Sequence, residues 1–218
     1  MGVVQHRAPQ HIDAPAKETP GGDPETRHIQ DSIFSISDST DLSSLNEIRL
    51  PIPQPKNICP EMKELPQWVL WRSEKRDGKP TKVPYHPKGY KASSNKPRTW
   101  SPFQAVWSKY QAGGFDGIGF VFSDQDDFIG VDLDHILDES GNVKESEQWV
   151  LDVLDRLQGS YTELSPSGDG LHVIVRGSLP EPGGNDGKPG GDPHLEIYYS
   201  GRYFTITGDL WSNGDAND

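Results

Sequence analysis

Two aspartates one residue apart interrupt the apolar run "FIGVDLDHIL" at residues 128–137. Side chains of a strand alternate between the two faces of a sheet, so Asp132 and Asp134 are predicted to share one face while Val131 and Leu133 point into a core. Carboxylate oxygens are the usual ligands of Mg²⁺ and Mn²⁺, and a pair at this spacing suits metal-assisted phosphoryl transfer. Because an Asp-x-Asp pair is also common at solvated strand edges, the motif alone leaves both interpretations open.

A second segment, "ELSPSGDGLHVIVRG" at residues 163–177, places a Ser/Gly-rich turn directly before a strand. The hydroxyls of Ser165 and Ser167, the backbone N–H groups of the turn and the imidazole of His172 are suited to bind an anion, and phosphate is the natural candidate. A hairpin turn followed by a surface histidine explains the same residues without any ligand.

The third segment, "HLEIYYSGRYFTITG" at residues 194–208, predicts two short strands around a Ser-Gly turn. Glu196 stands between apolar residues, where a carboxylate is costly unless it is paired or bound to a metal, so it is predicted to be a third metal ligand. After the turn, Arg202 is suited to bind a phosphate and Tyr203 to pack against a sugar or base. An edge strand with exposed polar residues is the alternative.

In this order the three motifs resemble the archaeo-eukaryotic primase superfamily, and within it the primase-polymerase domains of phages and plasmids. The upstream segment "QWVLWRSEKRDGKPTKVPYHPKGYKASSNKPRTWS" is similar to the N-terminal part of the same domain, so the resemblance covers about residues 66–208. It implies that Asp132, Asp134 and Glu196 hold the catalytic Mg²⁺ or Mn²⁺ ions and that His172 contacts the phosphates of an incoming nucleotide.

Charge is distributed unevenly along the chain. The formal net charge is -12, but residues 63–98 hold 10 basic and 3 acidic residues, a net of +7. The window also contains Trp68, Trp71, Tyr85 and Tyr90, and aromatic residues interleaved with cations are typical of surfaces that bind single-stranded nucleic acid. For the two tryptophans, a place in the core or half-buried in a strand is favoured over base stacking.

Four residues of this window are predicted to reach the nucleotide together with His172 and Arg202, although exposed lysines and a Ser-Ser turn are usually solvated surface. These four residues are Lys82, Lys91, Ser93 and Ser94.

The first 56 residues are rich in Pro, Ser, Asp, Gln and Gly and are predicted to be a disordered tail that catalysis does not need. The catalytic domain is then expected over residues 57–218. One cysteine, Cys59, excludes an internal disulfide and a cysteine-based zinc module. The start of the chain lacks the apolar core of a signal peptide and no apolar run approaches membrane-spanning length, which predicts a cytoplasmic protein without a membrane partner.

The sequence predicts an α+β fold with one mixed or antiparallel sheet and helices packed on it. The resemblance to the primase-polymerases implies that this is their catalytic fold, with an RNA-recognition-like sheet. A helix is expected to start at Ser101 as N-cap with Pro102 in its first position, and another to cover residues 145–157 and stop at Gly159. Residues 180–194 are predicted to be a mobile loop. Strands are expected near residues 68–72, 81–85, 118–122, 128–133, 161–164 and 171–175, and over 195–206 with an internal turn.

The function expected from the residues and the resemblance is template-dependent nucleotidyl transfer, as by a DNA primase or polymerase, in the replication of a phage, plasmid or other mobile element. The expected partners are a single-stranded DNA template, nucleoside triphosphates and a separate replicative helicase. Two alternatives use the same residues: a non-catalytic remnant that binds single-stranded nucleic acid, and a metal-dependent nuclease.

Overall fold

A computed structural model describes residues 50–178 and 192–212 of the chain. The tail predicted to be disordered lies outside these ranges except for residues 50–56, and most of the loop predicted at residues 180–194 lies outside them as well. None of the helices within the described ranges has the length and apolar character needed to cross a membrane.

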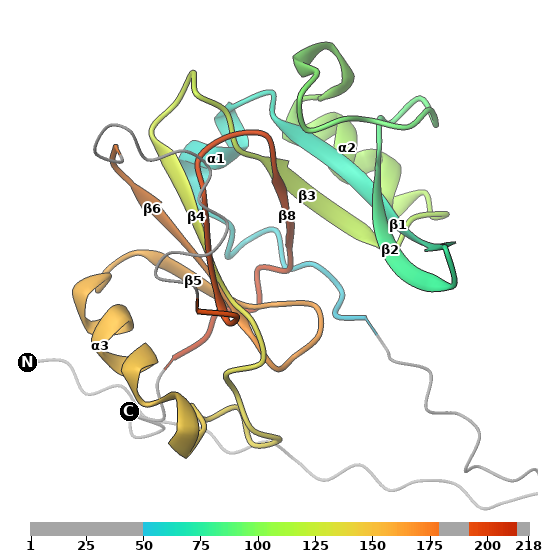
Figure 1. Cartoon of the computed structure of the whole chain (residues 1–218). Helices are drawn as coiled ribbons and strands as arrows, with labels where there is room; N and C mark the ends of the chain where they lie inside the picture. The colour runs from blue at the N-terminus through green and yellow to red at the C-terminus, as the bar shows by residue number, and fades with distance from the viewer. Residues whose placement is uncertain (1–49, 179–191, 213–218) are drawn as a thin grey trace, which may run out of the picture. The chain divides into compact units, whose positions relative to one another are not determined.

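The strands form two separate four-stranded sheets in which every strand pairing described is antiparallel (Figure 1). The first sheet has the order β2-β1-β3-β8 and the second the order β5-β6-β4-β7. The α+β class is therefore confirmed, but the strands do not form the single sheet that was predicted. The strands are β1 (Trp68–Arg76), β2 (Lys79–Tyr85), β3 (Gly117–Val121), β4 (Phe128–Leu133), β5 (Tyr161–Leu164), β6 (Leu171–Arg176), β7 (Leu195–Tyr198) and β8 (Tyr203–Ile206).

The region predicted as strand 195–206 shows how the sheets divide. Its two halves are β7, which pairs with β4, and β8, which pairs with β3. Since β3 and β4 themselves belong to different sheets, the short turn between β7 and β8 carries the chain from one sheet to the other. A local pattern of apolar residues predicts both strands but contains nothing about which neighbour each one takes.

Aromatic rings fill the space between the two sheets. Phe122 and Phe204 meet edge to face with ring centroids 4.8 Å apart, and both lie against Gly130 of β4. A Cβ at Gly130 would come within 2.5 Å of either ring, so only glycine allows β4 to pass this close. The core between the sheets thereby fixes the position of β4, the strand that carries Asp132.

A helix packs against one face of each sheet. In the first sheet, Trp68 packs against Phe103 of α2 (Phe103–Gln111). In the second, α3 (Trp149–Arg156) buries Val150 in a cluster with Leu133 and Val173. The remaining short helices are α1 (Pro60–Glu64), η3 (Pro97–Thr99) and η4 (Glu145–Glu147).

Both predicted helices begin later than expected. Ser101 does not cap α2, because its backbone exchanges two hydrogen bonds of 2.9 Å with Trp68, and the helix begins at Phe103. The helix predicted over 145–157 is a short 3₁₀ turn, η4, followed by α3, and Gly159 adopts a φ of +79° beyond its end. Pairing with a strand thus overrides the local preference of Ser101 for an N-cap.

The hairpin of β1 and β2 extends well beyond the two strands predicted there. Its turn is Asp77-Gly78, and both residues have positive φ values of 50° and 79°. An Asp-Gly pair is favoured in two-residue hairpin turns that need this backbone conformation. The hairpin projects the basic residues of its distal half into solvent.

Residues before the predicted domain boundary pack on the folded unit. The backbone N–H of Gln54 donates to the carbonyl of Thr207 at 2.7 Å, Pro53 is buried, and Lys63 donates to the carbonyl of Pro55 at 2.9 Å. Burial and hydrogen bonds therefore hold residues 53–55, on the N-terminal side of the boundary at residue 57 that composition predicted.

This packing predicts different outcomes for two truncations. A chain starting at Ile48 should unfold at the same temperature as the full chain, whereas one starting at Asn57 should lose about 1–3 kcal/mol of stability with the contacts of Pro53 and Gln54. Thermal and urea unfolding of the two proteins measure the difference. Equal stability of both truncations would show that residues 48–56 contribute nothing to the fold.

Candidate active site

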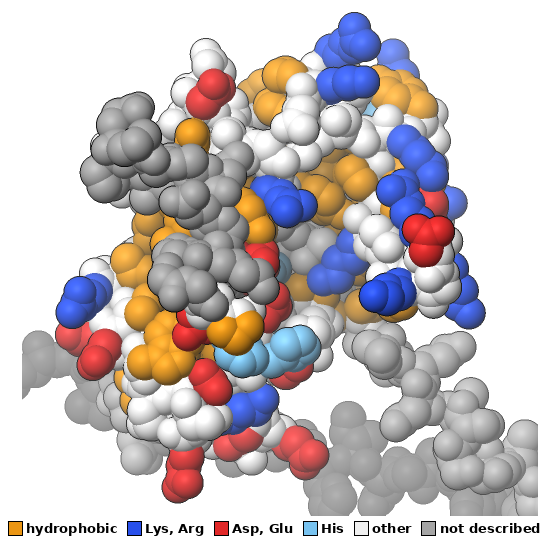
Figure 2. All heavy atoms as spheres, in the orientation of Figure 1, with side chains coloured by type: hydrophobic (Ala, Val, Ile, Leu, Met, Phe, Trp, Pro, Cys, Tyr) orange, Lys and Arg blue, Asp and Glu red, His pale blue; other side chains and the backbone are white. Residues whose placement is uncertain are grey.

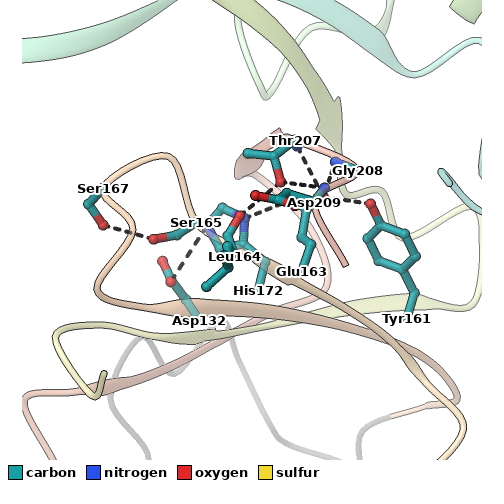
Figure 3. Close-up of polar contacts among 10 residues, drawn as sticks. All are labelled: Asp132, Tyr161, Glu163, Leu164, Ser165, Ser167, His172, Thr207, Gly208 and Asp209. Carbon is teal, nitrogen blue, oxygen red and sulfur yellow. Dashed lines mark hydrogen bonds and ion pairs between the residues drawn. The ribbon is translucent and has the colours of Figure 1, made fainter. Parts of the chain in front are cut away.

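Four polar side chains form one row across the second sheet. Antiparallel register places Glu163 of β5 opposite His172 of β6, His172 opposite Asp132 of β4, and Asp132 opposite Glu196 of β7. Residues directly opposite one another in a sheet share a face, so all four side chains point to the same side. Figure 3 shows three of them converging, with His172 between Glu163 and Asp132.

The alternation within each strand explains why the row is polar on one face only. The opposite face of the same strands carries leucine and valine, which pack under α3. On the face of the row, the next row toward the core contains Tyr161, Ile174, Gly130 and Tyr198. The polar row therefore lies where the packing between the two sheets ends.

Glu163 is completely buried, yet its carboxylate is well supplied with donors. Its Oε2 accepts hydrogen bonds from the hydroxyl of Tyr161 at 2.5 Å and from the backbone N–H groups of Thr207 at 3.0 Å and Gly208 at 2.7 Å. Its Oε1 lies 3.2 Å from Nδ1 of His172. A carboxylate with this many donors is stable as an anion although water does not reach it.

Two further contacts hold His172. Its ring stacks on Phe204 of β8, with centroids 4.7 Å apart and planes 23° apart. Its Nε2 lies 3.8 Å from Oδ1 of Asp132, which is beyond hydrogen-bonding distance. The imidazole thus has one nitrogen engaged by Glu163 and the other directed toward the aspartate.

Asp132 is the member of the row whose carboxylate is least well supplied with hydrogen bonds among those described. Within the described ranges its Oδ1 is buried and has no hydrogen-bond partner. Burial, together with the nearby carboxylates of Asp134 and Glu196, raises its pKa to about 6, against the opposing effects of His172 and Lys82. His172 and Lys82 therefore compensate the negative charge at this position only in part, and a bound cation would compensate it further.

The other two predicted metal ligands lie close to Asp132. Asp134 follows the end of β4, and its backbone N–H donates to the carbonyl of His194 at 2.9 Å. Glu196 accepts a hydrogen bond from the hydroxyl of Tyr198, whose ring lies under the guanidinium of Arg202 at 5.1 Å. The three carboxylates thus lie on β4, directly after β4 and on β7, and their joint binding of metal stays a prediction.

The carboxylates do not form a finished metal cage. Within residues 50–178 and 192–212, no three His, Cys, Asp or Glu side chains are grouped so that they would hold a metal ion by themselves. Magnesium is usually bound through one or two carboxylates plus water and substrate phosphates, not by an all-protein cage. The donor set and the unpartnered oxygen of Asp132 therefore fit an ion that binds together with a phosphorylated substrate.

A separate basic pocket of about 280 Å³ lies where β2, the loop after it and the start of β8 meet. It unites five of the residues predicted to bind a nucleotide, and Ser94 fixes its loop by donating from Oγ to the carbonyl of Gly201 at 2.8 Å. The residues that line it are Arg76, Val83, Pro84, Lys91, Ala92, Ser93, Ser94, Arg202 and Tyr203. Of its cations, Lys91 is partly neutralised by Glu74 at 2.9 Å.

Lys82 connects the pocket side of the molecule with the acidic row. It belongs to β2 of the first sheet, yet its ammonium lies near enough to Asp132, Asp134 and Asp169 for all three to favour its charged form. Partial removal from water nevertheless lowers its pKa. In Figure 2, Lys and Arg side chains gather over β1 and β2, carboxylates gather over the other half, and the surface between them is hollowed.

Three of the residues predicted to bind a nucleotide, Ser165, Ser167 and Tyr203, have other contacts. Ser165 is only 4% exposed and its hydroxyl is 2.8 Å from that of Ser167, so only Ser167 is open to solvent. Tyr203 lies over Gly119 and donates its hydroxyl to the carbonyl of Lys82 at 2.7 Å, which leaves its ring to support the pocket. Ser165, Ser167 and His172 do not line the basic pocket.

The aromatic residues of the basic window are buried with one exception, and the two tryptophans are core residues, as the alternative interpretation predicted. Trp68, Trp71 and Tyr85 are buried, whereas Tyr90 is 47% exposed and stacks on His86 with centroids 4.5 Å apart. Among these aromatic residues, only Tyr90 is thus placed to stack on a base.

Sequence inspection missed two residues of the site. Arg76 lies in the strongly basic window but was not distinguished from its neighbours. Glu163 carried the same indication that identified Glu196, a carboxylate inside a strand, but its burial depends on β8, which is remote in sequence.

No protein-family model matches the chain. Over 150 residues, which are 68% of the chain, it is 45% identical to the DNA primase-polymerase of Nitratiruptor phage NrS-1. The chain is related to the phage primase-polymerases. This relationship confirms the resemblance drawn from the motifs. The match spans 20% of the length of the phage primase-polymerase, so the chain corresponds to a small part of that protein.

Because the pKa of Asp132 is raised, replacing its ionised carboxylate by a neutral amide is predicted to stabilise the fold. The folded state holds this proton more tightly than the unfolded state, so ionised Asp132 costs stability above about pH 6, and the cost disappears as the pH falls toward 4. In the presence of a chelator at pH 8, the free energy of unfolding of Asp132→Asn should therefore be about 1–3 kcal/mol higher than that of the wild type. Near pH 4 the two values should differ little.

Urea unfolding at both pH values measures this difference. Arg156→Ala, on the exposed side of α3, is the control for a change of charge remote from the row. An Asp132→Asn protein that is less stable than the wild type at pH 8 would contradict the assigned environment.

Proposed function

We propose that the chain is the catalytic part of a template-dependent nucleotidyltransferase that acts as a DNA primase or polymerase in phage or mobile-element replication. The supporting observation is the row of Glu163, His172, Asp132 and Glu196, in which Oδ1 of Asp132 finds no hydrogen-bond partner among the described residues and faces a basic surface. The relationship to a phage primase-polymerase supports the same activity. We also propose that the two sheets are the primase-polymerase fold, with its RNA-recognition-like sheet.

Asp132, Asp134 and Glu196 would hold Mg²⁺ or Mn²⁺ in this scheme. When bound, the ions would stabilise charge on the reacting phosphate and promote attack by a 3′-hydroxyl. The new bond joins that oxygen to the α-phosphorus of a nucleoside triphosphate, and the bond to pyrophosphate breaks. Lys82, which faces the same carboxylates from the first sheet, is placed to balance their charge when substrate is absent.

The triphosphate is proposed to extend from the acidic row into the basic pocket. Arg202 is the residue that connects the two, since it lines the pocket and also covers Tyr198, the donor to Glu196. Arg76, Ser93 and Ser94 supply further donors for phosphate oxygens. His172 would meet the phosphates nearest to the row.

The template strand is proposed to lie along the exposed basic surface of the β1–β2 hairpin and the loop that follows. Residues 72–98 contain 9 basic and 2 acidic residues, and the Lys and Arg side chains seen over this region in Figure 2 provide phosphate contacts. The stacked pair His86 and Tyr90 is placed within this surface to receive a base.

One assay separates this function from its alternatives. The protein is incubated with labelled single-stranded or primed DNA, nucleoside triphosphates and Mn²⁺. The proposal predicts longer products, which Asp132→Asn should abolish while remaining folded. A nuclease would instead shorten the DNA, and a binding remnant would leave it unchanged, and either outcome would refute the proposal.

The placement of Arg202 predicts a defect in nucleotide binding. Arg202→Ala should raise the KM for nucleotide by about 10- to 100-fold, the value of a lost charge-assisted hydrogen bond, with a smaller change in kcat. Arg156→Ala removes the same charge from the exposed surface of α3 and should have no effect. An unchanged KM in the Arg202 variant would exclude the pocket as the triphosphate site.

A further inference from the structure

The buried carboxylate of Glu163 has no assigned role in the proposed catalysis. It lies at one end of the polar row, is 0% exposed, and belongs to β5, the strand farthest from Glu196 in the sheet. No substrate reaches a residue in this position, so its effect on chemistry must pass through a neighbour. The neighbour in the row is His172.

The hydrogen bonds of Glu163 determine which nitrogen of His172 carries a proton. Three donors already bind Oε2, two backbone N–H groups and one phenol O–H, and such a set of partners suits the ionised carboxylate, which only accepts hydrogen bonds. Oε1 is an acceptor too, and it faces Nδ1 of His172 at 3.2 Å. With Glu163 ionised, this contact is a hydrogen bond from Nδ1–H of His172 to Oε1.

The remaining contacts fix the direction of the ring. Stacking on Phe204 prevents rotation of the imidazole out of its plane, and Nε2 is directed toward Asp132. A ring held at Nδ1 and on one face has its Nε2 as the atom presented to the site. Carboxylate partners of functional histidines commonly act in this way, by fixing tautomer and orientation.

We propose that Glu163 is a positioning residue, which holds His172 as the Nδ1–H tautomer with Nε2 directed to the phosphates of the bound nucleotide. This inference rests on the proposed function for the role of Nε2, but the orientation and tautomer of the ring do not depend on it. Because Thr207 and Gly208 follow β8, the same carboxylate also ties the first sheet to the histidine of the second.

Nuclear magnetic resonance of the ¹⁵N-labelled histidines tests the tautomer in the wild-type chain, with His172→Ala used to assign the signal. The proposal predicts a proton on Nδ1 of His172 in the absence of substrate. A ring with bare Nδ1 and protonated Nε2 would overturn it. This measurement requires no catalysis, so it remains decisive even if the chain proves to have no polymerase activity.

A double-mutant cycle tests the functional coupling. Glu163→Gln should lower kcat/KM for nucleotide incorporation by about 10- to 100-fold in the wild-type background. In the His172→Ala background the same substitution should change kcat/KM by no more than about twofold, since its effect passes through the imidazole. An equal loss in both backgrounds would show a general structural role and refute the proposal.

Tyr161→Phe provides the matched control. It removes one donor to Oε2 of the same carboxylate and leaves Oε1 and His172 untouched. It should therefore lower thermal stability but leave the proton of His172 on Nδ1. The loss of kcat/KM that His172→Ala causes should be as large in Tyr161→Phe as in the wild type. If Glu163→Gln does not fold, the tautomer in the wild type and in Tyr161→Phe decides the proposal.

Discussion

The buried carboxylate of Glu163 joins two segments that are distant in sequence, the paired strands β5 and β6 and the residues that follow β8. It accepts backbone hydrogen bonds from Thr207 and Gly208, which follow the last strand of the first sheet, and it contacts His172 in the middle of the second. A carboxylate without water needs all of these donors, and an unfilled acceptor there would cost several kcal/mol. The hydrogen bonds that keep the anion stable thus also hold the sheets in register at the edge of the site.

The aromatic core complements this polar connection. Phe122 and Phe204 pack against Gly130 and bring β4 and β8 close together, and the ring of Phe204 extends the same packing to His172. Rigid aromatic contacts on one side and directional hydrogen bonds on the other leave little freedom for the imidazole. A site whose supporting residues are themselves packed and hydrogen-bonded keeps its geometry before substrate arrives.

Opposite charges are divided between the two halves of the molecule. The acidic row belongs to the second sheet, whereas Arg76, Lys82 and Arg202 belong to the first sheet or its edge. In the function proposed above, neither half alone would retain a nucleotide with bound cations, because the carboxylates repel phosphate and the basic pocket repels cations. Under that proposal, the apposition of the two halves across the hollow in Figure 2 would supply both sets of contacts.

The sequence by itself determined the features that depend on short-range alternation and composition. Period-two patterning placed Asp132 on the polar face of its strand, an acid among apolar neighbours identified Glu196, and the motif order identified the family relationship that the phage primase-polymerase confirms. Tertiary structure alone decided that the strands form two sheets, that Ser101 pairs with Trp68 instead of capping a helix, and that Glu163 is buried. These outcomes depend on contacts between segments far apart in the chain, such as Gln54 with Thr207 and Glu163 with Gly208, and local propensities contain no information about which distant partner a strand or carboxylate will meet.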